Sequence, residues 1–144
     1  MSLDFDSARL PNNALTSEHH EWRAQLRRFF DREVIPYAEE WDENGAIPDE
    51  LWPKSAAVGI LGLGFPEEFG GITEGIDIWH SIILNEEMAR IAVGGIAATL
   101  MVHGIGLPPV INFGSDAINQ PSFFKTLAIS LIWFEKSNSR AAVI

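Results

Sequence analysis

The most constrained backbone in this chain of 144 residues runs from Gly59 to Gly71 and reads GILGLGFPEEFGG. Glycine accepts positive φ without strain at Cβ, whereas Pro66 fixes its own φ and favours extended geometry at Phe65. The pattern therefore predicts that a helix ends at Gly59, that residues 60 to 65 run extended, and that the chain turns tightly at Gly70-Gly71. A connector of defined shape is thus expected between two helices.

Helical periodicity precedes this connector. Apolar residues spaced by threes and fours predict a first helix, capped at Thr16 or Ser17, interrupted near Pro36 and ended at Asn44-Gly45. A second helix is expected to open at residues 48 to 50, where Pro53 falls in the permissive first turn, and to stop at Gly59.

Helical patterns also follow the connector. We expect a third helix from about residue 74 to 91, with Ile76, Trp79, Ile83 and Met88 facing inward. After a break at Gly94-Gly95, we expect a fourth helix over 96 to 103 and a fifth over 107 to 113 with Gly114 as C-cap. The fourth helix is apolar almost all round, which predicts burial on most sides. The fold class predicted from these patterns is all-α, a bundle of five to six helices.

Composition narrows the possible partners and compartments. A net charge of −10 argues against nucleic acid or an anionic membrane as a partner of the whole surface. The chain has no cysteine, which excludes disulfides and a cysteine nucleophile and is compatible with a reducing cytosol, so we predict a cytoplasmic location. The start lacks a secretory signal pattern, and the longest apolar run, residues 91 to 102, is shorter than the about 20 residues of a membrane span.

Charged residues form two notable groups. Four arginines at helical spacing are expected to form a solvated face: Arg23, Arg27, Arg28 and Arg32. Glu86 and Glu87 are adjacent, so on a helix they point about 100° apart and cannot face one substrate carbon together. We expect one exposed carboxylate and one that pairs with Arg90.

The histidines do not suggest a metal site. His19 and His20 diverge on a helix, whereas His80 and His103 have no carboxylate at ligand spacing. No P-loop, serine elbow or dinucleotide fingerprint is present either. No catalytic, cofactor-binding or metal-binding residue is therefore assigned.

Two blocks of sequence, at residues 51 to 71 and 85 to 114, are the most specific part of a resemblance to a known family. They read LWPKSAAVGILGLGFPEEFGG and NEEMARIAVGGIAATLMVHGIGLPPVINFG. In this order and spacing the chain resembles the N-terminal helical domain of the acyl-CoA dehydrogenases. The resemblance implies a flexible arm over 1–14, the helical domain over 15–118 and a divergent apolar tail over 119–144. It also implies acyl-CoA as substrate, FAD as cofactor and an electron-transfer flavoprotein as redox partner of the intact enzyme.

The resemblance further implies part of the wall around the fatty acyl chain. The matching positions are Ala97, Ala98, Met101, Val102 and Ile105. Small alanines beside a flexible methionine would leave room for an acyl tail. Helical spacing alone favours these side chains as plain core, and the resemblance brings the core and wall interpretations near parity.

The family pattern stops at Asn119. The family would continue with a basic helix and then a strand with a Thr-Glu-Pro turn, whereas here Asn119-Gln120-Pro121 is followed by an apolar stretch over 123 to 134. Either the reading frame is interrupted or the gene has lost its remainder. In the family, the flavin site and the catalytic glutamate come from domains absent from this sequence, so the chain alone is expected to be inactive. The alternative is a non-enzymatic helical interaction module, whose partner would be another copy or the missing domains.

Overall fold

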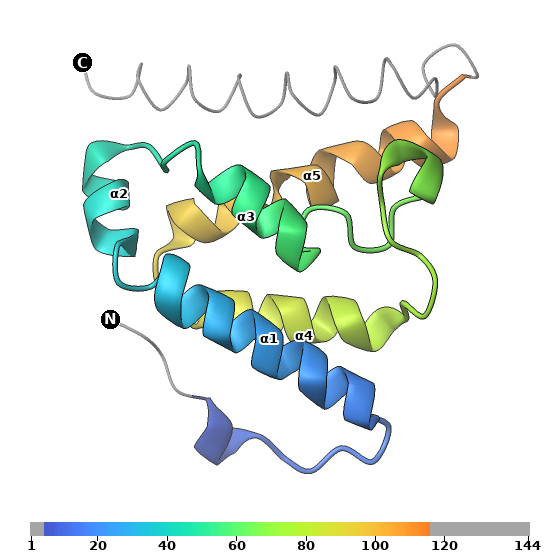
Figure 1. Ribbon diagram of the computed structural model, residues 1–144, viewed down its shortest axis with the longest axis horizontal. Coiled ribbons are helices and arrows are strands. Elements are labelled where there is room, and N and C mark those ends of the chain that lie inside the picture. Colours follow the sequence, from blue (N-terminus) through green and yellow to red (C-terminus); the bar gives the residue numbers. More distant parts are fainter. Residues whose placement is uncertain (1–4, 116–144) are drawn as a thin grey trace.

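A computed structural model describes residues 5–115 of the chain, so the predicted tail over 119–144 lies outside the described residues (Figure 1). The described part contains five α-helices, two short 3-10 helices and no strand, which confirms the all-α class. The α-helices are α1 (Ser17–Glu33), α2 (Ala38–Asn44), α3 (Leu51–Val58), α4 (Ile78–Ala89) and α5 (Gly94–Phe113), and the 3-10 helices are η1 (Asp6–Ala8) and η2 (Glu67–Phe69).

The first two helices follow the predicted punctuation. Thr16 caps α1, and its side chain and the His19 side chain form a reciprocal capping box. The chain breaks at residues 34 to 37 around Pro36, and Gly45 ends α2 with a left-handed φ of 63°. The predicted cap, interruption and end are therefore confirmed.

The connector matches its prediction at both ends but not in the middle. Gly59 ends α3 at φ 96°, and Gly70 turns the chain at φ 85°, as expected. The prediction of an extended run over residues 60 to 65 is wrong, because these residues form turns, apart from one isolated parallel bridge between Leu63 and Ile72. The segment folds back on itself: the Ile72 amide donates to the Gly62 carbonyl at 2.9 Å. This folding back pairs backbone amides and carbonyls of the connector that would lack a partner within it if the segment were extended.

Helix α5 replaces the two helices predicted for residues 96 to 113. It continues through Pro108 and Pro109, and Gly94 and Gly95 lie in its first turn. The break falls earlier, where Ala92 has φ 60°. Each proline removes one bond to a carbonyl four residues back, but Gly104 and Ile105 are exposed, so water can satisfy those carbonyls.

The core lies mainly between α1, α3 and α4. Leu26, Phe30 and Ile83 are fully buried, and Met88 is 2% exposed, which confirms Ile83 and Met88 as inward-facing residues of α4. Helices α1 and α4 lie side by side and run in the same direction, as the colours of Figure 1 show. Paired contacts along them support this parallel arrangement, from His19 and Asp77 at one end to Asp31 and Arg90 at the other.

Helix α5 is less buried than predicted. It contributes Ile96, Leu100 and Leu107 to the interior, but only 18% of its most apolar 18-residue stretch is buried. Within the described residues it is the one helix long and apolar enough to cross a membrane by length and composition alone. Core helices of soluble proteins meet the same criterion, and Ile96 and Leu100 do belong to the core cluster here.

Candidate functional site

A cavity of about 500 Å³ lies between the connector, α4 and α5. Its volume falls within the range of about 300–1,000 Å³ that small-molecule sites usually have. Among the described residues its lining is apolar apart from Ser81, Asn85 and Asn112, and it holds no charged side chain. The lining residues are Ile60, Leu61, Leu63, Gly64, Phe65, Pro66, Ser81, Leu84, Asn85, Met88, Leu100, Met101, Gly104, Ile105, Pro108, Ile111 and Asn112.

Only part of the expected acyl-chain wall lines this cavity. Met101 and Ile105 do, whereas Ala97, Ala98 and Val102 are not among its lining residues. The lining positions of α5 recur at spacings of three and four, 101, 105, 108 and 112, so they share one helix face. Val102 directly follows Met101 and so points about 100° away from it, whereas Ala97 and Ala98 precede the first lining residue of α5, Leu100.

The connector supplies residues that the sequence reasoning did not place in the wall. Leu63, Phe65 and Pro66 close one side of the cavity, and Leu84 and Met88 of α4 close another. The unusual glycine and proline content of residues 59 to 71 was the available signal. It indicated a shaped backbone but not that this shape forms a binding wall.

The cavity suits an alkyl chain better than a whole FAD molecule. FAD carries a diphosphate, which proteins usually hold with cations or with backbone amides at a glycine-rich turn into a helix. The described lining offers no cation, and its polar side chains are one hydroxyl and two amides. The described lining of this cavity therefore does not fit FAD.

Apart from the cavity, a cluster of charged residues centres on Glu87, whose side chain is fully buried between α1 and α4. Its carboxylate accepts from Arg27 Nε and Nη2 at 3.0 and 2.8 Å, from Arg23 at 3.2 Å and from Arg90 at 3.2 Å. Burial raises the pKa of Glu87, but the hydrogen bonds and charges of these arginines outweigh it and lower that pKa. The expected Glu87–Arg90 pair is thus confirmed, with Arg23 and Arg27 as further hydrogen-bond donors and Arg9 as an ion-pair partner 3.7 Å away.

The expectation of a solvated arginine face is wrong for half of its members. The Arg23 and Arg27 side chains, 12% and 29% exposed, bind Glu86 and Glu87 of the neighbouring helix. Arg28 and Arg32 are exposed. Spacing along one helix could not show that partners some 60 residues away would cover one side of the row.

The segment before α1 joins the same cluster. Asp6 accepts from both terminal nitrogens of Arg27, at 2.5 and 3.0 Å, and Arg9 lies 3.3 Å from Glu86. These ion pairs anchor residues 6 to 9 against α1 and α4. The domain boundaries at residues 14 and 118 stay a prediction.

A second cluster gathers where α1 and α4 begin. Asp77 caps α4, and its Oδ1 lies 3.0 Å from His19 Nε2 and 2.9 Å from His80 Nδ1. The expectation that His80 lacks a nearby carboxylate is therefore wrong, because Asp77 lies three residues before it. Burial raises the pKa of Asp77, but hydrogen bonds from His80, His19 and the Trp79 amide lower it to about 2.

Comparison with known proteins gives a consistent family. The family model described as "Acyl-CoA dehydrogenase, N-terminal domain" matches residues 16–127. The mitochondrial long-chain specific acyl-CoA dehydrogenase of Sus scrofa is 38% identical over 101 residues, which cover 70% of this chain and 23% of that protein. The probable acyl-CoA dehydrogenase YngJ of Bacillus subtilis is 29% identical over 109 residues, 76% of this chain and 28% of that protein.

Solved structures agree with these sequence matches. A probable acyl-CoA dehydrogenase from Mycobacterium abscessus superposes with a TM-score of 0.65 at 35% identity, over 81% of this chain and 30% of that one. The chain thus spans about a quarter of the length of the curated relatives it matches.

Proposed function

Because the chain belongs to the acyl-CoA dehydrogenase family through its N-terminal domain, we propose that it provides one wall of a fatty acyl site in an FAD-dependent acyl-CoA oxidoreductase. The reaction class is inferred from the family resemblance: oxidation of the Cα–Cβ bond of an acyl-CoA. On the same basis, an electron-transfer flavoprotein would reoxidise the intact enzyme. The absence of cysteine supports a cytoplasmic location.

The observation that supports this proposal is the uncharged cavity of about 500 Å³. An alkyl chain gains from an apolar lining because its burial removes hydrocarbon from water, at roughly 0.8 kcal/mol per buried CH₂. Met101 has an unbranched side chain that can adjust to such a tail, and Ile105 lies one turn further along α5. Ala97, Ala98 and Val102 do not line the cavity, so we propose no contact between these three residues and the acyl chain.

The described residues would bind and orient the acyl tail and exclude water around it. FAD accepts the electrons of the oxidation when bound. The lining of the acyl cavity does not fit that cofactor, so we propose that this polypeptide by itself is catalytically silent.

The predicted lack of catalytic activity of the isolated chain is tested by purifying it with excess FAD and assaying it with an acyl-CoA. We expect colourless protein after desalting and no turnover with an artificial electron acceptor. Flavin retained at one equivalent, or measurable turnover, would show that the polypeptide carries a flavin site of its own.

The acyl wall is tested by calorimetry with octanoyl-CoA and with CoA alone. We expect affinity to depend on the acyl group, and Met101→Glu to weaken it at least tenfold by placing a charge in the cavity. Ala98→Glu is the matched control, since it adds the same charge at an exposed position of the same helix outside the cavity. Equal octanoyl-CoA affinity in the wild type and Met101→Glu would contradict the wall.

A second candidate function is a helical interaction module. The specific observation is the exposed apolar surface of α5, where Ile105 is 68% and Phe113 88% exposed. Contiguous apolar surface of this kind commonly marks a protein interface. A chain that elutes as a monomer at all concentrations and retains no partner would remove the support for this function.

A further inference from the structure

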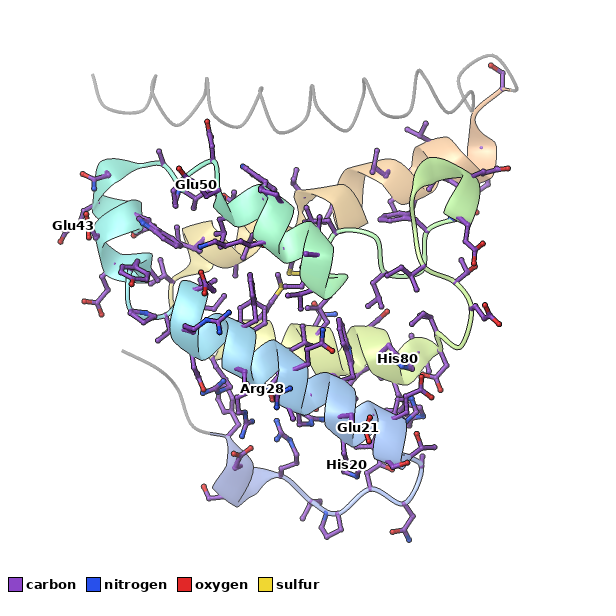
Figure 2. The ribbon with its side chains drawn as sticks, in the orientation of Figure 1. His20, Glu21, Arg28, Glu43, Glu50 and His80 are labelled. Carbon is purple, nitrogen blue, oxygen red and sulfur yellow. The ribbon has the colours of Figure 1, made fainter. Side chains whose placement is uncertain are left out.

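The first turns of α1 and α4 bring together three side chains that the acyl cavity does not use. We propose that His19, Asp77 and His80 bind one divalent transition metal ion, best matched by Zn²⁺, and that the ion ties α1 to α4. Figure 2 shows His80 at the start of α4, close to the first turns of α1 that carry His20 and Glu21. The proposal concerns the opposite end of α4 from the arginine cluster and does not depend on the proposed function.

The ligand set and its geometry carry the inference. One ligand atom from each of the three residues can be chosen so that all lie within 4.8 Å of one another. Two imidazoles and a carboxylate are ordinary zinc ligands, with bonds of about 2.0–2.2 Å that hold tetrahedral ligand atoms roughly 3.3 Å apart. The separations to Asp77 Oδ1, 3.0 Å from His19 and 2.9 Å from His80, are only slightly shorter.

The ligands also have the right balance of rigidity and access. Both histidines are 4% exposed, and their rings pack edge to face with centroids 4.6 Å apart. The Asp77 side chain is 50% exposed, so it can move outward by the few tenths of an ångström that an ion requires. An ion can reach the site from the Asp77 side, where a water molecule would complete the coordination.

A histidine ligand binds through a nitrogen without a proton, and its other nitrogen is normally held by an oxygen acceptor. His19 meets this condition, because its Nδ1 lies 3.1 Å from Thr16 Oγ1 while its Nε2 is directed at Asp77. With Nδ1–H donating to that hydroxyl, Nε2 is free to bind the metal. In the structure the Thr16 amide lies 3.0 Å from Nδ1 and donates to it, so metal binding at Nε2 would replace this hydrogen bond with the one from Nδ1–H to Thr16 Oγ1.

The charges around the cluster decide whether a cation is tolerated. The positive ends of two helix dipoles oppose it. The Asp77 carboxylate offsets them. A second carboxylate, Glu18 in the first turn of α1, lies near the chain just before Asp77, since its Oε1 is 3.8 Å from where a Cβ on residue 75 would be. The net charge of −10 further raises the local concentration of cations.

The test titrates the full chain with Co²⁺ followed by visible absorption, and with Zn²⁺ followed by calorimetry. We expect one ion per chain and at least tenfold weaker binding in His19→Gln and His80→Gln. Glutamine at the third helical position preserves a capping box, so these variants remove the ligand and keep the helix start. Asp77→Asn likewise keeps the cap and removes the carboxylate, and should also weaken binding at least tenfold.

His20→Gln is the matched control, because His20 is exposed and adjacent to His19 but outside the cluster. Circular dichroism verifies that each variant is folded. Loss of binding in the three ligand variants with full binding in His20→Gln supports the site. Absence of one-to-one binding to the wild type, or equal binding by the wild type and folded His19→Gln, overturns it.

Discussion

At the scale of single residues, Glu87 shows how a buried charge is made tolerable. A carboxylate removed from water costs several kcal/mol unless partners replace its hydration. Here three arginines from two helices surround it, and each contributes a charge-assisted hydrogen bond. The same contacts join α1 to the C-terminal end of α4.

Replacing Glu87 by glutamine should therefore lower the free energy of unfolding by about 3–5 kcal/mol, because the arginines lose their common counter-charge. Urea unfolding measures this difference. Glu86→Gln is the control: its side chain is 40% exposed and the variant should cost no more than about 1 kcal/mol. Equal losses in the two variants would contradict the role assigned to Glu87.

The stabilisation by Glu87 should depend on pH in a defined direction. Its pKa in the folded protein is lowered from the ordinary value of 4.5, so the folded state favours the ionised form. The contribution is fully present above pH 4.5 and is lost as the pH falls through the folded pKa. The difference in unfolding free energy between wild type and Glu87→Gln should thus shrink below pH 4.5. A difference that stays constant from pH 7 to pH 3 would be the contrary result.

At the scale of elements, the connector depends on the absence of a side chain at residue 71. A Cβ there would lie 2.0 Å from the Phe65 carbonyl oxygen and 2.5 Å from Phe65 Cβ, so backbone would have to move. Because Phe65 lines the acyl cavity, this contact couples the fold of the connector to the shape of the proposed site.

Gly71→Ala should destabilise the domain by about 1–3 kcal/mol and weaken octanoyl-CoA binding. Gly70→Ala separates the causes, since residue 70 has φ 85° but no atom within 4 Å of an added Cβ. That variant should cost about 1–2 kcal/mol through backbone strain alone and leave the ligand affinity unchanged. Thermal unfolding and calorimetry measure both effects, and unaltered affinity in Gly71→Ala would contradict the coupling.

Local patterns predicted the elements well and the contacts between them poorly. The Thr16 cap, the Gly45 and Gly59 ends and the inward Ile83 all follow from nearby residues. The division of α5 was mispredicted because prolines and glycines usually end a helix, and exposure of the freed carbonyls is a tertiary property. The arginine and histidine clusters join residues about 60 positions apart, which helical spacing cannot reveal.

For the site, the sequence placed Met101 and Ile105 on the correct helix, and both line the cavity. It could not show that Val102 points away from the cavity, because an almost wholly apolar helix has no periodic pattern to orient it, nor that the cavity begins only after Ala97 and Ala98. The wall formed by the connector required the fold itself.

At the scale of the whole molecule, much apolar surface remains outside the core. Ile78 on α4 is 67% exposed, and the apolar side chains of α5 are exposed over a longer distance. Such surface favours association, since contact between two copies would remove it from water.

Sedimentation should therefore show association of the wild-type chain that increases with concentration. The double variant Ile105→Glu/Phe113→Glu should shift the protein toward monomer, because both residues are more than two-thirds exposed and lie on α5. Ile78→Glu provides the control, an equally exposed position on α4. Identical sedimentation of wild type and the double variant would exclude α5 as the associating surface.

The parallel packing of α1 and α4 has a consequence for how the domain folds. Two neighbouring helices that run the same way cannot be joined by a short hairpin, and the contacts between them span 58 to 64 residues of sequence. Folding must close this long loop before those contacts can form, which slows helical domains that depend on distant pairing.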